Sequence, residues 1–175
     1  MFIKNFKISA SLLVLFSVAA GVLIFKIPSS IAANKSGTTH GDWKVACEKN
    51  TTTKKDVCFI QQSLSVTQDD KQVPLATYQF MYGEDKNLKL LEVLPQGILL
   101  QPGTSIIVGE KVLGNAKFTV CQNNTCLAVA DVSKKDLDTI LSGADVSIGM
   151  FNSEGKQTNL ILSTKGLKEA LNDIK

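Results

Sequence analysis

The sequence contains no arginine, so all 19 of its basic residues are lysines. Bidentate recognition of phosphates or bases by guanidinium groups is therefore excluded, which argues against a dedicated nucleic-acid-binding protein. Histidine is nearly absent too, because His40 is the only one. Since His40 precedes the expected fold, we expect neither a nucleophile activated by a rigidly placed imidazole nor a metal site with several histidines.

The sequence also lacks the usual motifs of catalysis. Its glycines are scattered in turns and form no phosphate-binding loop, and no Cys-x-x-Cys motif occurs. Three pairs of carboxylates fall in predicted turns or on a helix surface among lysines: Asp69 with Asp70, Glu84 with Asp85, and Asp136 with Asp138. Such carboxylates are usually solvated, so we predict a protein that is not an enzyme and has no catalytic residues, metal site or cofactor.

Charge is distributed unevenly along the chain. Lys4, Lys7 and Lys26 lie in an N-terminal segment without acidic residues, and the remainder has 16 lysines against 16 acidic residues. This remainder is neutral and has no overall field that would attract nucleic acid or anionic lipid. Its mixed composition, with 44% hydrophobic and 20% charged residues over the whole sequence, is typical of one globular domain.

The N-terminal segment has the pattern of a secretory signal peptide. Residues 8–25 are 18 consecutive uncharged, mostly apolar residues with a lysine on either side. Pro28 and small residues follow, which end a helix and suit a signal peptidase. We predict a signal peptide over residues 1–33, cleaved after Ala32 or Ala33. The alternative is an uncleaved anchor, because 18 residues approach the lower limit for crossing a bilayer.

Residues 34–41 are small and polar, which predicts a flexible tether before a folded domain over residues 42–175. In that domain, alternating apolar residues and turn signals predict about eight short strands, with a short run at 98–100 among them. Trp43 begins the first strand and is expected to anchor the core. No predicted helix separates successive strands, so the fold class is all-β, an antiparallel β-sandwich.

Two short helices are expected near the C-terminus. Ser133, three residues before Asp136, has the spacing of a helix cap, and Gly143 marks the end of that helix. The second helix follows from the apolar spacing of residues 167–174, with Gly166 near its start.

All four cysteines follow the signal segment. Ten residues separate Cys47 from Cys58 and four separate Cys121 from Cys126, so each pair flanks a polar loop between predicted neighbouring strands. We predict the local disulfides Cys47–Cys58 and Cys121–Cys126 rather than crossed pairings, because hairpins bring opposed Cβ atoms into range. The ten-residue spacing disfavours a four-cysteine zinc site. Disulfides together with a signal peptide predict export to the periplasm or cell envelope. The outer surface and secretion into the medium are the alternatives.

Five short motifs occur in order over nearly all of the chain that follows the signal segment. They are Gly41-Asp42-Trp43-Lys44-Val45-x-Cys47, Cys58-Phe59-Ile60-x-Gln62, Leu94-Pro95-x-Gly97-x-x-Leu100, Cys121-x4-Cys126-x-Ala128 and Leu162-Ser163-x-Lys165-Gly166-Leu167-x-x-Ala170-Leu171. This order resembles the invasion-associated locus B family. Leu167 departs from the family, which commonly has Phe there, and a core tolerates that change.

The resemblance implies an immunoglobulin-like β-sandwich, exported by α-proteobacteria and linked in some pathogens to invasion of host cells, especially erythrocytes. It names no partner. We expect a virulence protein that acts by protein interaction, with a partner on the host-cell surface or in the bacterial envelope; the membrane is involved only through an uncleaved N-terminal segment. The alternative is a periplasmic housekeeping module without host contact. Loops 51–55, 68–72 and 83–87 are the expected contact surfaces.

Overall fold

The computed structural model describes residues 35–175. The predicted signal peptide and its cleavage site lie outside these residues. The described part contains strands and two helices in the order β1 (Thr39–His40), β2 (Trp43–Lys49), β3 (Asp56–Gln68), β4 (Lys71–Tyr82), β5 (Leu88–Pro95), β6 (Thr104–Val108), β7 (Lys111–Gln122), β8 (Thr125–Val132), α1 (Lys134–Ile140), β9 (Val146–Phe151), β10 (Gln157–Leu162) and α2 (Leu167–Asp173).

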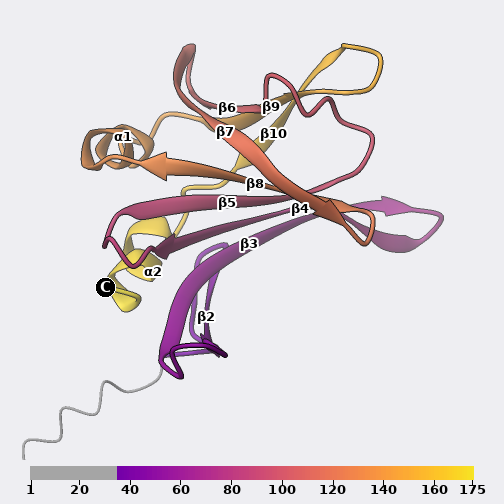
Figure 1. Cartoon of the computed structure of the whole chain (residues 1–175). Helices are drawn as coiled ribbons and strands as arrows, with labels where there is room; N and C mark the ends of the chain where they lie inside the picture. The colour runs from indigo at the N-terminus through magenta and orange to yellow at the C-terminus, as the bar shows by residue number, and fades with distance from the viewer. Residues whose placement is uncertain (1–34) are drawn as a thin grey trace, which may run out of the picture. The chain divides into compact units, whose positions relative to one another are not determined.

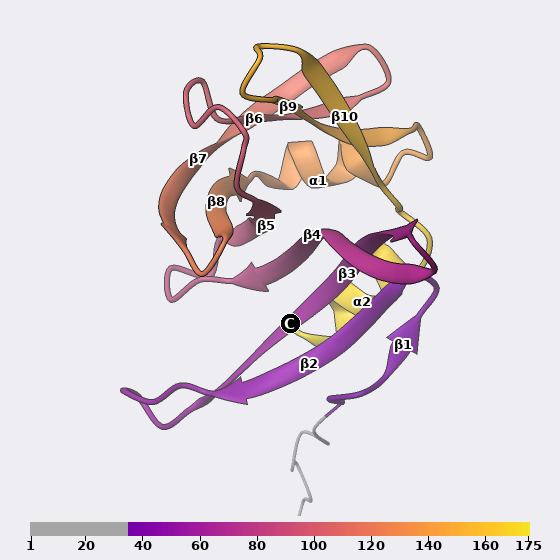
Figure 2. The same cartoon turned by 90° about the vertical axis from the view of Figure 1, so that its right-hand side faces the viewer.

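The strands form two layers that share β7. The hydrogen-bonded order is β1-β2-β3-β4-β5-β8-β7-β6-β9-β10, and neighbouring strands are antiparallel throughout. Residues 111–116 of β7 pair with β6, and residues 117–122 pair with β8, with a register shift in each pairing. Figures 1 and 2 show β6, β9 and β10 facing the larger layer. The predicted all-β sandwich with two short helices is confirmed, and its sheets are continuous because β7 bends from one into the other.

Period-two alternation places the core between the layers. In β5, Leu88, Leu90 and Leu94 are buried on the inward face, while Lys89, Leu91 and Val93 on the other face are partly exposed. Trp43 is fully buried, as predicted, and its ring lies 5.5 Å from that of Phe80. An indole hides a large apolar area, so Trp43 anchors the first long strand to the sheet.

Two local expectations differ from the structure. Residues 98–100 form no strand; Ile98 makes a single bridge to Asn152, because the turns at Gly97 and Pro102 leave too few residues for a ladder. The predicted tether, residues 34–41, is partly folded, since Thr39 and His40 form β1 against β2. Order therefore begins before residue 42.

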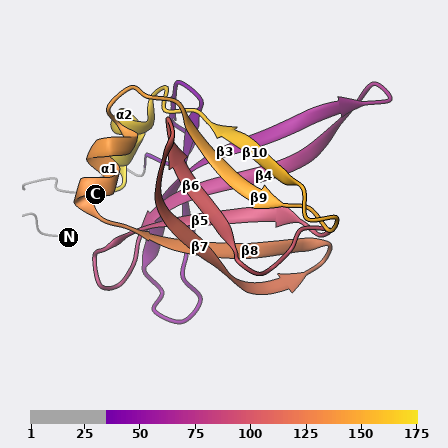
Figure 3. The same ribbon diagram turned by 90° about the horizontal axis from the view of Figure 1, so that it is seen from above.

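Both helices begin where the sequence predicted. The Ser133 hydroxyl caps α1 by accepting the Asp136 N–H at 3.1 Å. Gly166 precedes α2 with φ +80°, and a side chain there would collide with the backbone of His40 and Gly41. Only glycine permits this close approach, which brings the N-terminal hairpin against the start of α2. Figure 3 shows both helices at the same end of the sandwich.

Candidate functional site

The two disulfides are Cys47–Cys58 and Cys121–Cys126, the predicted pairing. In both hairpins the bonded cysteines are directly opposite each other in the strand register. Each bond therefore fixes the spacing of two neighbouring strands beside a loop. No described cysteine is free.

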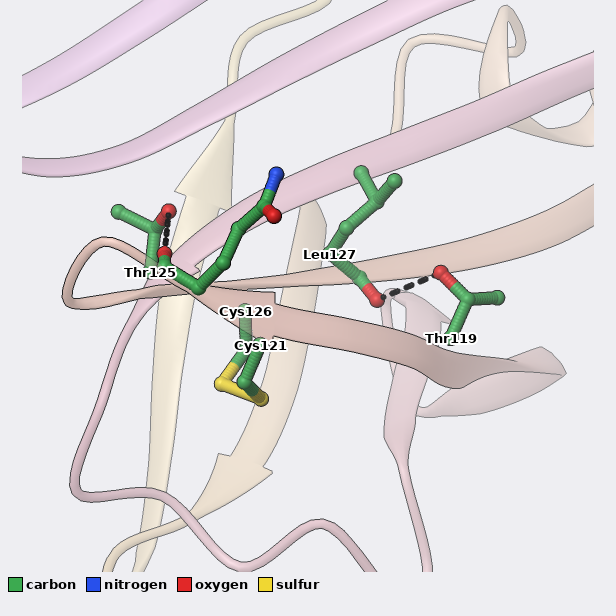
Figure 4. The surroundings of a disulfide bond; sticks show 6 residues. Thr119, Cys121, Thr125, Cys126 and Leu127 are labelled. Carbon is green, nitrogen blue, oxygen red and sulfur yellow. Dashed lines mark hydrogen bonds between the residues drawn. A yellow bond between two sulfur atoms is a disulfide. The ribbon is translucent and has the colours of Figure 1, made fainter.

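The Cys121–Cys126 bond closes the tip of the β7–β8 hairpin (Figure 4). At the tip, the Thr125 hydroxyl donates to the Gln122 carbonyl oxygen at 3.1 Å. On the other side of the bond, the Thr119 hydroxyl donates to the Leu127 carbonyl oxygen at 3.2 Å. These hydroxyls satisfy backbone acceptors on both sides of the bond, so the disulfide and the two hydrogen bonds hold the hairpin tip together.

The Cys47–Cys58 bond lies beside a groove of about 880 Å³. The groove brings together two of the three predicted contact loops, because residues from both 51–55 and 83–87 line it. We call it the disulfide groove. Its apolar lining consists of half-buried side chains from β3, β4 and the C-terminus: Val57, Phe59, Met81, Tyr82 and Ile174.

Charges of both signs surround this apolar lining. Glu48, Lys49, Lys55, Asp56 and Glu84 line the groove, and all five are exposed. An apolar centre with a polar, solvated rim is the usual composition of a protein-binding surface. Because both signs of charge are present, the groove is a poor match for a simple anion or cation.

The third predicted contact loop, 68–72, lies elsewhere. It is the tip of the β3–β4 hairpin, which Figure 3 shows extending beyond the neighbouring strands. Asp69 and Asp70 are exposed there, both with positive φ. This loop is therefore separate from the disulfide groove.

The predicted carboxylate pairs have separate local roles. Asp85 accepts the Asn87 backbone N–H at 3.1 Å, and that hydrogen bond is the main cause of the lowered pKa of Asp85. Asp136 belongs to the helix cap, whereas Glu84 lines the disulfide groove. The structure brings no two of these pairs into one site.

His40 contacts the C-terminal helix. Its Nε2 lies 2.8 Å from Asp173 Oδ2, and Lys35 Nζ lies 2.6 Å from Asp173 Oδ1. The Lys35 hydrogen bond, followed by that of His40, lowers the pKa of Asp173. These contacts tie the N-terminal residues to α2.

Glu92 is the titratable residue that the sequence analysis missed. It is fully buried on β5, where Thr104 Oγ1 donates to its Oε2 at 2.6 Å and its Oε1 has no hydrogen-bond partner. Burial raises the pKa of Glu92 to about 7, and the Thr104 hydrogen bond opposes that rise. The neighbouring Tyr78 hydroxyl is also buried without a partner, and its pKa is raised by burial and by the charge of Glu92.

The signal for Glu92 was present in the sequence. Leu88, Leu90 and Leu94 define the inward face of β5, and the same alternation places residue 92 on that face. Glu92 lines none of the described grooves. It is therefore a single buried carboxyl inside the sandwich, outside these three grooves.

A second groove, of about 700 Å³, lies between the two helices. Leu137 of α1, Leu141 directly after α1 and Leu171 of α2 form part of its wall, and lysines also line it. Among residues 35–175 there is no cluster of three or more histidine, cysteine or acidic side chains that could hold a metal ion. No helix in that range is long and apolar enough to cross a bilayer.

Three of the five sequence motifs meet at Ser163. The Gln62 side chain accepts the Ser163 backbone N–H at 2.9 Å, and Trp43 Nε1 donates to the Ser163 carbonyl oxygen at 2.9 Å. The Ser163 hydroxyl donates to Asp42 at 2.6 Å. These bonds join β2 and β3 to the segment that links β10 to α2. The residues of these three motifs therefore make contacts that stabilise the fold.

A family model described as "Invasion associated locus B (IalB) protein" matches residues 43–175, a span that includes both disulfides. The chain belongs to the invasion-associated locus B family. The fold agrees with a solved structure, the crystal structure of invasion associated protein B from Bartonella henselae. The TM-score is 0.65 at 20% identity, over 78% of this chain and 92% of that one. The comparison with curated proteins finds no match.

Membership in the invasion-associated locus B family confirms the resemblance seen in the five motifs. Three of those motifs contain the residues that are hydrogen-bonded at Ser163. Family membership links the chain to invasion-associated proteins, and the solved relative supports the sandwich fold. Chemistry at a particular surface has to be argued from this chain's own residues.

Proposed function

We propose that this chain is an exported envelope or surface protein that contributes to bacterial invasion of host cells by binding a protein, rather than by catalysis. The observation that carries the proposal is the disulfide groove, where two separated loops and an apolar lining come together. The family match supplies the link to invasion.

The disulfide groove suits protein binding for physical reasons. Phe59 and Met81 are directly paired across β3 and β4, so their side chains lie side by side on a rigid sheet. The Cys47–Cys58 bond restricts the motion of the adjoining β2–β3 hairpin. The hairpin therefore loses less conformational entropy when a partner binds. The charged rim then orients the partner and discriminates between partners.

The oxidising conditions that disulfides require support the proposed export. Erythrocytes are the first host cell to test, because the family resemblance points to them.

The test is binding of the purified, oxidised protein to erythrocytes. Wild type should bind saturably, and the double variant Phe59→Ala with Met81→Ala should bind at least about tenfold more weakly, because two apolar contacts at the centre of the interface are truncated. Val120→Ala is the matched control, since Val120 is an exposed apolar residue of β7 outside the groove.

All three proteins should unfold at similar denaturant concentrations, which separates loss of contact from loss of fold. Absence of saturable binding by wild type would contradict host-cell contact. Equal binding by the double variant would contradict the assignment to this groove.

A further inference from the structure

The two edges of the described sheet differ sharply. At one edge, β1 has only two residues, and the chain before it also protects β2: Val45 exchanges backbone hydrogen bonds with Gly37 and Thr38, and the Cys47 N–H donates to Ser36 Oγ. At the other edge, β10 has six residues with no charge and no proline, and its register with β9 is unbroken. Charges, prolines, bulges and short lengths are the usual protections of an edge strand, and β10 has none of them.

The free side of β10 is available for pairing. In an antiparallel ladder, alternate residues direct their backbone N–H and C=O groups away from the neighbouring strand. For β10, the described part of the chain supplies no backbone partner on the side opposite β9. Ile161, near the end of this strand, is 72% exposed, the largest exposure among the large apolar side chains of residues 35–175.

The sheet face beside this edge carries no charge. We call it the neutral face; it is the outward side of β10, β9, β6 and the first half of β7. Its residues are Ser105, Ile107, Val112, Asn115, Ser147, Gly149, Phe151, Gln157, Asn159 and Ile161.

The neutral face is closely packed at its centre. Gly149 lies there without a side chain, and a Cβ at that position would be 3.0 Å from Ile107 and 3.1 Å from Asn159. The neighbouring side chains therefore close over the glycine. In a sequence with 20% charged residues, a solvent-facing sheet surface without charge has the composition of an interface centre.

We propose that β10 pairs with β10 of a second copy, antiparallel about a twofold axis, so that the smaller layer continues from one chain into the other (Figure 3 shows β6, β9 and β10 side by side). A second copy presents the same uncharged strand, so pairing satisfies both free edges without opposing like charges. The assembly closes at two chains, because β1 protects the remaining edge of each.

This inference is independent of the proposed function, since the disulfide groove is built from β2, β3, β4 and the C-terminus. Sedimentation equilibrium of the purified, oxidised protein over a concentration series tests it. Wild type should approach twice the mass of one chain. Ile161→Lys and Asn159→Lys should each keep the single-chain mass, because two lysines would face the partner across the axis.

The matched control is Val66→Lys, which places the same charge at an exposed valine of β3. It should dimerise as wild type does, and so should Phe59→Ala with Met81→Ala. A wild type that stays at single-chain mass overturns the proposal, as do lysine variants that still dimerise. The proposal is also overturned if wild type stays at the mass of one chain and Ile161→Lys abolishes its binding to erythrocytes. In that case the β10 edge pairs with a strand of another protein.

Discussion

Glu92 places a carboxyl group inside the core, between Tyr78 of the neighbouring strand and Thr104 of the other layer. Burial penalises the charged form, so the folded protein holds the Glu92 proton to about pH 7, whereas the unfolded chain releases it near pH 4.5. Between these values the folded state binds more protons than the unfolded state. Stability from this group is therefore full below about pH 4.5 and is lost as the pH rises to about 7.

Glu92→Gln tests this linkage, because glutamine resembles the protonated carboxyl and does not titrate. The unfolding free energy of wild type should fall relative to Glu92→Gln by about 3 kcal/mol between pH 4.5 and pH 8. Urea unfolding at a series of pH values measures the difference. A difference that stays constant with pH would contradict a raised pKa for Glu92.

Gln62 is a second residue whose role is local and testable. Its amide accepts the Ser163 N–H on the inside of β3, while the next residue, Gln61, is partly exposed. Gln62→Leu should lower the unfolding free energy by about 1–3 kcal/mol, because the partly buried Ser163 N–H loses its acceptor. Gln61→Leu is the matched control and should change it by less than about 1 kcal/mol. Equal effects in chemical unfolding would rule out a special role for the Ser163 contact.

At the scale of elements, the two disulfides stabilise hairpins of different loop length. The chain-entropy model gives about 3 kcal/mol for Cys47–Cys58 and about 2 kcal/mol for Cys121–Cys126, because the first closes the longer loop. Paired Cys→Ser variants should follow that order in chemical unfolding. The reverse order would show that the loops already have structure in the unfolded chain.

Elements with strong local signals were predictable. The long strands follow from alternation, α1 follows from its serine cap, and the disulfide pairing follows from spacing across hairpins. β1 was not predictable, because two polar residues carry no periodicity and are held by β2 and α2. The disulfide groove forms where two loops that are distant in the sequence lie close together in the fold. The sequence predicted both loops as contact surfaces but did not predict that they line one groove.

At the scale of the whole molecule, the described chain is a sandwich whose layers share β7 and which carries two disulfide-bonded hairpins. The disulfides agree with the proposed export, because a reducing compartment keeps thiols free. The family was predictable from the order of the five motifs, three of which contain the residues that meet at Ser163, and the sandwich was predictable from the many strands without helices between them. The bent sheet was not, because it arises from register shifts within β7.

Mass spectrometry of the native protein, isolated from bacterial envelope fractions with thiols trapped at lysis, tests the central claim most directly. We predict a chain that begins after Ala32 or Ala33, has no free thiol, and yields peptides linked as Cys47–Cys58 and Cys121–Cys126. Four free thiols, or a metal ion bound among the cysteines, would contradict it.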